Sequence, residues 1–341
     1  MEILRPKALR PGSTLGIFTP SSPGYIFNEG LFANGLDTLR RLGFKIKLGK
    51  LTEARSHEGY RSGTPKARAE EFMQLIMDPE VDGLMSTIGG QNSSSLIPFL
   101  DFAAIRQARK PFCGFSDVTS LHLAILKYSG LTTIYGPAVM CWFGDWPDGV
   151  PESSQWYLEA VCQHLKGERE VRVPDRWSNF KRRWDNGDWK KLPREWEPNP
   201  GWKTLHPGVA RAPILAANLN TLASAAGTTY WPDLNGKILL LEDMEATLSR
   251  TERHLRQLSF IGVFDQIAGL IIGKPEFYNQ ESAPFGYHEL FREILGDRGY
   301  PIVGNFDCGH CVPMISIPQL SQAELSAEES VKFRFLEPGV S

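Results

Sequence analysis

The sequence lacks the features that mark several specialised classes of protein. Its 37 Lys and Arg against 39 Asp and Glu leave a formal charge of -2 over 341 residues, so it has no positive excess for nucleic acid or an anionic membrane. No run approaches the ~18 uninterrupted apolar residues of a membrane span, and the N-terminus lacks the apolar stretch of roughly 7 to 15 residues that a signal peptide needs. Five cysteines, an odd number in a long chain, do not suggest a disulfide framework. We therefore expect a soluble cytoplasmic protein that binds neither nucleic acid nor membranes.

Short apolar runs alternate with amphipathic segments in the first half of the chain. Runs at 14–19, 44–48, 82–88 and 111–115 predict strands, and segments at 31–42, 68–77 and 118–127 have the spacing of helices. This alternation predicts an α/β fold, with a Rossmann-like domain of parallel strands over residues 1–165. Ligands of such sheets bind at the carboxyl ends of the strands.

The regular pattern of apolar residues is lost at residues 166–206. Tryptophans there are scattered among charged residues and prolines, without the spacing of a helix or a strand. We interpret this stretch as a connection with surface loops, followed by a second domain at 207–341. In that domain we expect a loop running into a helix at 213–223, a helix at 251–258, and a frayed tail after the last strand. Its strands are predicted at 237–241, 266–272, 301–303 and 331–335.

The tetrapeptide Gly114-Phe115-Ser116-Asp117 stands between a predicted strand and a predicted helix. A serine on such a turn exposes its hydroxyl, and the first N–H groups of the helix point to the same spot. This is a candidate nucleophile with an oxyanion site, although position 118 is Val, so the full G-x-S-x-G pattern is absent. The alternative is that Ser116 or Asp117 simply caps the helix.

Three further features could contribute to a site. Gly89 and Gly90 follow a strand and would let the backbone approach a ligand, unless they only form a tight turn. Glu242 and Asp243 follow an apolar strand, where one of them could orient a histidine or both could belong to a solvated helix start. His310 lies in a Gly-containing loop and could act as a base, unless it only bonds to backbone in a turn.

A metal site is an alternative for that loop, because Cys308, His310 and Cys311 are all zinc-competent residues. Structural zinc sites need four ligands, and the sequence offers no second pair of cysteines at the usual spacing. It also contains no H-E-x-x-H helix. We therefore do not expect a metal site in this loop.

The ordered motifs resemble those of the LD-carboxypeptidase family of serine peptidases, and are most similar to its microcin C immunity branch. The resemblance spans nearly the whole chain, from residues 16–23 to the Gly309-His310 loop. The motifs between them are STIGGQNS at 86–93, GFSDVT at 114–119, ANLNTL at 217–222 and LED at 241–243. The resemblance implies a C-terminal α/β domain with a small β-barrel-like sheet, and a homodimer. It also implies that the protein uses neither a metal nor an organic cofactor.

The same resemblance implies roles for individual residues. Ser116 would be the nucleophile, His310 the general base and Glu242 the residue that orients it, with the backbone N–H groups of Gly90 and Asp117 as the oxyanion hole. The residues implied in substrate binding are Gln91, Asn92, Asn218, Asn220, Glu276 and one of two tryptophans, Trp184 or Trp189, in a lid that stacks on a nucleobase.

The sequence also departs from the general peptidoglycan-recycling branch of the family. The Gly-Gly turn is followed by Gln91 and Asn92 rather than by the Tyr-Gly typical of that branch, and Ala217 replaces a glycine before Asn218. We therefore expect a serine-type amidase that acts on a small peptide or a peptidyl- or aminoacyl-nucleotide. A murein tetrapeptide LD-carboxypeptidase, and a binding protein without turnover, remain the alternatives.

Overall fold

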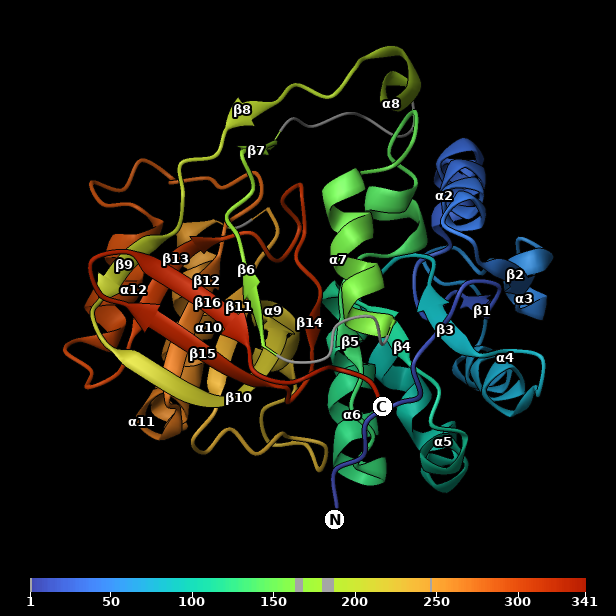
Figure 1. The fold of residues 1–341 in the computed structure, drawn as a ribbon, viewed down its shortest axis with the longest axis horizontal. Coiled ribbons are helices and arrows are strands. Elements are labelled where there is room, and N and C mark those ends of the chain that lie inside the picture. Colours follow the sequence, from blue (N-terminus) through green and yellow to red (C-terminus); the bar gives the residue numbers. More distant parts are fainter. Residues whose placement is uncertain (1, 163–167, 180–186, 246) are drawn as a thin grey trace.

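The computed structural model describes residues 2–162, 168–179, 187–245 and 247–341. Two sheets lie side by side, one built by the N-terminal part of the chain and the other by the C-terminal part (Figure 1). Within the described residues, no helix has both the length and the apolar composition required to cross a membrane.

The N-terminal sheet has the strand order β14-β5-β4-β3-β1-β2, and its members from β5 to β2 are parallel. Short β14 pairs antiparallel with β5 although it comes from the far end of the chain. The strands are β1 (Thr14–Phe18), β2 (Lys45–Leu48), β3 (Gly83–Ser86), β4 (Phe112–Gly114), β5 (Ile134–Tyr135) and β14 (Ile317–Pro318).

Helices cover both faces of this sheet, as expected where parallel strands need crossover connections. They are α1 (Gly24–Phe27), α2 (Glu29–Arg41), α3 (Lys50–Glu53), α4 (Pro65–Met77), α5 (Phe102–Ala108), α6 (Thr119–Ser129) and α7 (Pro151–Val161). Shorter helical turns are η1 (Ser93–Phe99), η2 (Ser116–Val118) and η3 (Val139–Phe143). The predicted Rossmann-like arrangement is confirmed.

The C-terminal sheet is mixed, with the strand order β6-β16-β15-β10-β11-β12-β13-β9. Strands β10 to β13 are parallel, and the others pair antiparallel. Edge strand β9 also contacts β15 near the other side of the sheet, so the sheet is curled. A second sheet in the C-terminal part of the chain was expected from the family resemblance. Its strands are β6 (Arg169–Val171), β9 (Lys203–His206), β10 (Val209–Asn218), β11 (Ile238–Glu242), β12 (Gly269–Gly273), β13 (Ile302–Phe306), β15 (Gln322–Ala327) and β16 (Val331–Phe335).

The helices of this part are α9 (Leu219–Ser224), α10 (Leu248–Phe260), α11 (Val263–Gln266) and α12 (Tyr287–Leu295). Leucines 239, 241, 255 and 258 lie in one apolar cluster between the parallel strands and these helices. The stretch between the sheets contributes β6 and β9 to the C-terminal sheet. It also forms a small pair of strands, β7 (Arg176–Trp177) with β8 (Glu197–Pro198), and α8 (Asp188–Lys191).

Two sequence expectations are wrong. Residues 213–218 are not a loop but the second half of β10, which pairs with β15 up to Pro213 and with β11 from Ile214 onward. Pro213 sits where the strand changes partners, which explains why its missing N–H is tolerated. The chain end is not frayed either, because Val340 is buried and Ser341 exchanges backbone hydrogen bonds with Pro6 and Ala8.

Candidate active site

Ser116 lies on a tight turn at the carboxyl end of β4. The strand ends at Gly114, and Ser116 opens η2, which leads directly into α6. The φ angle of Ser116 is 60°, a left-handed conformation that non-glycine residues seldom adopt. Such strain is often found at functional sites, where it turns a side chain away from the sheet. The strand–turn–helix predicted from the sequence is therefore present.

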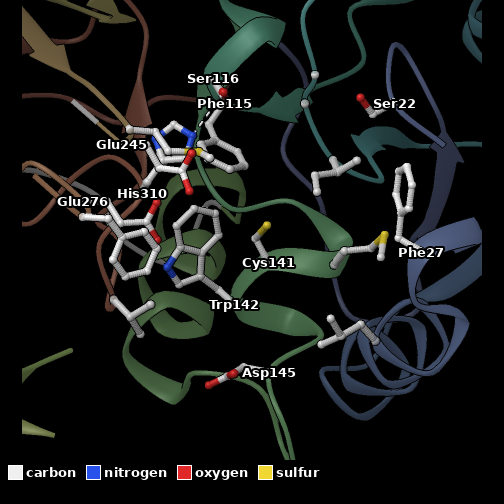
Figure 2. Close-up of a pocket in the computed structure, with 18 of the residues that line it drawn as sticks. Ser22, Phe27, Phe115, Ser116, Cys141, Trp142, Asp145, Glu245, Glu276 and His310 are labelled. Carbon is white, nitrogen blue, oxygen red and sulfur yellow. Dashed lines mark hydrogen bonds between the residues drawn. The ribbon is translucent and has the colours of Figure 1, made fainter. Parts of the chain in front are cut away.

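His310 connects Ser116 to Glu242. Its Nε2 lies 3.1 Å from the Ser116 Oγ (Figure 2). Its Nδ1 lies 2.6 Å from the Glu242 Oε2. An ionised carboxylate only accepts hydrogen bonds, so Nδ1–H donates to Glu242 and Nε2 is left to accept from the serine hydroxyl. Gly309 allows this approach, because it has φ 128° and a β-carbon there would lie 2.6 Å from the Glu242 Cβ.

Glu242 is completely buried at the end of β11 and is held by several donors. Besides His310, the Tyr135 hydroxyl donates to Oε1 at 2.6 Å and the Asn218 side-chain amide donates to the same oxygen at 3.0 Å. Asp243 points elsewhere, because its carboxylate accepts from Met244 N–H at 2.9 Å and faces α10. The structure therefore brings Glu242, and not Asp243, to the histidine.

The charges of this pair stabilise each other. Burial raises the pKa of Glu242, but the charge and hydrogen bond of His310 and the other donors outweigh it, and the net shift is downward. Burial lowers the pKa of His310, but the Glu242 carboxylate reverses this, and the net shift is upward. At neutral pH the acid is ionised, and the histidine is a stronger base than a free imidazole.

The Gly89-Gly90 turn lies against the Ser116 segment. A β-carbon at Gly89 would stand 3.4 Å from the Asp117 backbone nitrogen, and one at Gly90, where φ is 152°, would stand 2.3 Å from the Ser21 Oγ. The Asp117 carboxylate accepts the Ser93 N–H at 2.9 Å, which ties the turn to η2. The two backbone segments predicted to form the oxyanion hole are therefore adjacent.

A cavity of about 900 Å³ opens beside Ser116 and His310. Figure 2 shows these two side chains on one side of the cavity and Phe27 and Ser22 on the opposite side. Both sheets contribute to its wall. The lining residues include Gly89, Gly90, Gln91, Asn92, Phe115, Trp142, Asp145, Trp189, Arg194, Glu245, Glu276 and Phe277.

The predicted substrate-binding residues fall into three groups. Gln91, Asn92, Trp189 and Glu276 line the cavity. The structure does not bring the other two asparagines into it: Asn218 is buried against Glu242, and Asn220 is exposed on α9. Trp184 lies outside the described residues. Trp189 is largely buried and packs edge-on against Trp146, with a ring centroid distance of 6.1 Å.

Arg194 and Glu276 are two charged residues in the wall of the cavity, and their charges are held in different ways. Arg194 forms a two-pronged ion pair with Asp145, with nitrogen–oxygen distances of 2.9 and 3.1 Å, so its charge is largely neutralised. The pKa of Glu276 is raised to about 7, mainly by burial and further by the charges of Glu242 and Glu245, against the opposing charges of His310 and Arg194. A cationic group bound beside Glu276 would favour its ionised form.

Sequence reasoning missed the second contact layer of the site. Tyr135 and Asn218 were not predicted as partners of Glu242, and Arg194 was not predicted in the cavity wall. Tyr135 ends a parallel strand and precedes a glycine and a proline, which is the place where ligand-facing residues gather in such sheets. That strand is only two residues long, too short for a periodic signal.

The metal alternative can be tested directly. Among the described residues, no three His, Cys, Asp or Glu side chains are grouped as metal ligands. Both His310 nitrogens are engaged by Glu242 and Ser116, and burial raises the pKa of Cys311.

We expect a chelator to leave hydrolysis unchanged, and Cys311→Ser to retain activity in the fraction that folds. Complete loss with a chelator, reversed by zinc, would falsify the metal-free site.

The fold and the site together define an α/β protein with the serine–histidine–carboxylate geometry that serine hydrolases use. Comparison with known families agrees. Residues 15–136 match the N-terminal domain of LD-carboxypeptidases, and residues 211–325 match the C-terminal domain. The chain belongs to the LD-carboxypeptidase family of peptidases.

Individual relatives cover almost the whole chain. A Vibrio cholerae protein named as a carboxypeptidase is 35% identical over 93% of each chain. The microcin C7 self-immunity protein MccF of Escherichia coli is 34% identical, over 91% of this chain and 89% of its own. The solved structure of MccF with aspartyl sulfamoyl adenosine superposes with a TM-score of 0.93 at 32% identity, covering 99% of this chain and all of the other.

Proposed function

We propose that this protein is a serine-type, carboxypeptidase-like amidase that hydrolyses a small aminoacyl- or peptidyl-nucleotide. The observation that carries the proposal is the hydrogen-bonded series from Ser116 through His310 to Glu242 at the edge of a large cavity. A nucleophile, a base and a residue that orients the base form the set that serine hydrolases with a triad use for covalent acyl transfer.

In the first half of the reaction, the Ser116 Oγ attacks the substrate carbonyl while His310 Nε2 takes its proton. Glu242 holds the imidazole by Nδ1 and stabilises the imidazolium that forms. The proton then passes to the leaving nitrogen, the carbon–nitrogen bond breaks, and the acyl group remains on Ser116. In the second half, water gives a proton to His310 and attacks the ester carbonyl. His310 then gives that proton to the Ser116 Oγ as the ester bond breaks, which releases the acid and restores the serine hydroxyl.

The oxyanion of each tetrahedral intermediate needs donors on the far side of the carbonyl from His310. We assign this role to the backbone N–H groups of Gly90 and Asp117, on the two adjacent turns. Each such donor typically lowers the barrier by about 3 to 4 kcal/mol. A β-carbon at Gly90 would clash with the Ser21 and Ser22 hydroxyls. We therefore expect that no residue other than glycine fits at position 90.

Similarity to MccF supports the nucleotide part of the substrate. MccF structures contain adenosine monophosphate, aspartyl sulfamoyl adenosine and glutamyl sulfamoyl guanosine. In this protein the cavity extends from the catalytic pair to the aromatic residues Trp189, Phe27 and Tyr60. Aromatic faces of this kind can stack on a base, and Glu276, Gln91 and Asn92 are available to the polar part of the ligand.

Trp189 provides a test of the nucleotide assignment. Trp189→Ala is expected to raise KM for an aminoacyl-nucleotide about tenfold, because stacking on a base contributes about 1 to 3 kcal/mol. A murein tetrapeptide has no base, so its KM is expected to stay constant. Steady-state kinetics on both substrates check this.

Trp196→Ala is the matched control, because Trp196 lies in the same segment but packs against Arg176. Equal losses on both substrates in Trp189→Ala, or no loss on either, would favour the general carboxypeptidase.

Murein tetrapeptide LD-carboxypeptidase activity is the second candidate function. It is favoured by a Bacillus subtilis relative named as a murein peptide carboxypeptidase, which is 28% identical over 99% of this chain. A panel with a murein tetrapeptide and an aminoacyl sulfamoyl adenylate separates the two candidates. A fluorophosphonate that labels Ser116 separates both from a binding protein without turnover.

The proposal includes a homodimer in the cytoplasm. The family resemblance supports the dimer, and all five cysteines are free, which suits a reducing compartment. Sedimentation of the purified protein tests the first point, and fractionation of cells tests the second.

A further inference from the structure

Tyr135 lies between the nucleophile and the acid of the proposed triad. Its side chain is fully buried, at 0% exposure, at the end of β5 in the N-terminal sheet. The hydroxyl accepts the Ser116 backbone N–H at 3.0 Å and donates to the Glu242 Oε1 at 2.6 Å. Glu242 belongs to the C-terminal sheet, so one hydroxyl connects catalytic groups from the two halves of the molecule.

The protonation states fix the direction of these bonds. Burial, followed by the charge of Glu242, raises the pKa of Tyr135 well above its usual range, so the phenol keeps its proton. Glu242 is ionised and only accepts. The sole direction left is Ser116 N–H to Tyr135 oxygen, and Tyr135 O–H to Glu242.

This arrangement has two consequences for catalysis. The N–H of the strained Ser116 is held inside the protein by Tyr135, so it is not free to donate to an oxyanion. The carboxylate that orients His310 is in turn held by a group bonded to the nucleophile's own backbone. A shift of one sheet against the other would break the Tyr135–Glu242 bond and, with it, the contact between His310 and Ser116, because these two bonds cross between the sheets.

We propose that Tyr135 is a positioning residue, which sets the distance and alignment between Ser116 and the His310–Glu242 pair across the two sheets. The inference rests on the proposed triad and adds to it a residue that touches no substrate. Among the ionisable groups near the pair, Glu276 and Asp243 act on His310. Cys308 faces both Tyr135 and Glu242, and the charge of Glu242 also acts on Cys311 and Tyr287.

Tyr135→Phe removes the hydroxyl and keeps the ring. We expect kcat to fall about 10- to 100-fold with KM changed less than about threefold, because the substrate does not contact this group. Glu242 loses a donor, so its negative charge acts more strongly on His310 and raises the pKa of the base. The acidic limb of the kcat/KM profile is therefore expected to move to higher pH.

Tyr157→Phe is the matched control. Tyr157 is equally buried, at 1% exposure, but it packs between Phe44 and Phe143 in the N-terminal core, away from Ser116. Its kcat per active site and its pH profile are expected to equal those of the wild type. Titration with a fluorophosphonate gives the concentration of competent Ser116 in every sample, so misfolded protein does not enter kcat.

A fluorinated tyrosine at position 135 keeps the hydroxyl and covers the case in which Tyr135→Phe fails to fold. Its more acidic phenol donates more strongly to Glu242, so the acidic limb is expected to move to lower pH, opposite to Tyr135→Phe. Unchanged kcat per titrated site, or an acidic limb that stays in place in the folded variants, would overturn the inference. Wild-type protein that hydrolyses nothing would instead count against the proposed function.

Discussion

Purified Ser116→Ala is expected to lose about three to six orders of magnitude in kcat while remaining folded. The half-buried side chain stands on the turn at the end of β4, and its Oγ contacts His310. Removing that one atom takes away the attacking group but leaves the core unchanged. The left-handed φ of 60° stays with the alanine, so we expect at most a small change in melting temperature.

The measurement is steady-state hydrolysis of the best substrate in the panel, together with circular dichroism and thermal melting. The binding cavity is retained, so Ser116→Ala is also expected to bind that substrate with nearly wild-type affinity. More than a tenth of wild-type activity in pure Ser116→Ala would show that another group is the nucleophile.

Glu242→Gln is expected to lower kcat by about two to four orders of magnitude. The amide has nearly the shape of the carboxylate, but it carries no charge to stabilise the imidazolium and can present an N–H to His310 Nδ1. The charge of Glu242 is what raises the pKa of His310 against the effect of burial. In Glu242→Gln that pKa falls, so the acidic limb of residual activity is expected to move to lower pH.

Asp243→Asn is the matched control for this change. Asp243 is the next residue, is buried and has a pKa raised to about 6 by burial, yet its carboxylate contacts Met244, Arg250 and Thr251 rather than the histidine. We expect Asp243→Asn to keep at least a tenth of the activity. The opposite result, an inactive Asp243→Asn and an active Glu242→Gln, would mean that the wrong carboxylate was assigned.

Segments with a strong local pattern were predicted well. The strand, turn and helix around Ser116 follow from an apolar run, a glycine and a helical period, and all three are present. The second half of β10 was missed because Pro213 and the small residues after it read as a loop. Its place in the sheet depends on two partner strands, one of which begins more than a hundred residues away.

The candidate catalytic residues were easier to recognise from the sequence than the side chains that form hydrogen bonds with them. The motif resemblance pointed to Ser116, Glu242 and His310 together, whereas Asn218 was expected to contact substrate and instead donates to Glu242. Tyr135 carries no motif and lies on a two-residue strand. Its role exists only because β5 and β11 end beside each other.

The sequence by itself determined the α/β class, most of the strands of the N-terminal sheet and the turn that presents Ser116, because these depend on neighbouring residues and regular periods. Only the tertiary structure decided that Ser116 and His310, 194 positions apart, lie within hydrogen-bond distance and that Tyr135 joins them to Glu242. It also separated Glu242 from Asp243, because successive side chains of an extended chain point in opposite directions. Such contacts arise from the packing of two sheets against each other, and no local pattern records that packing.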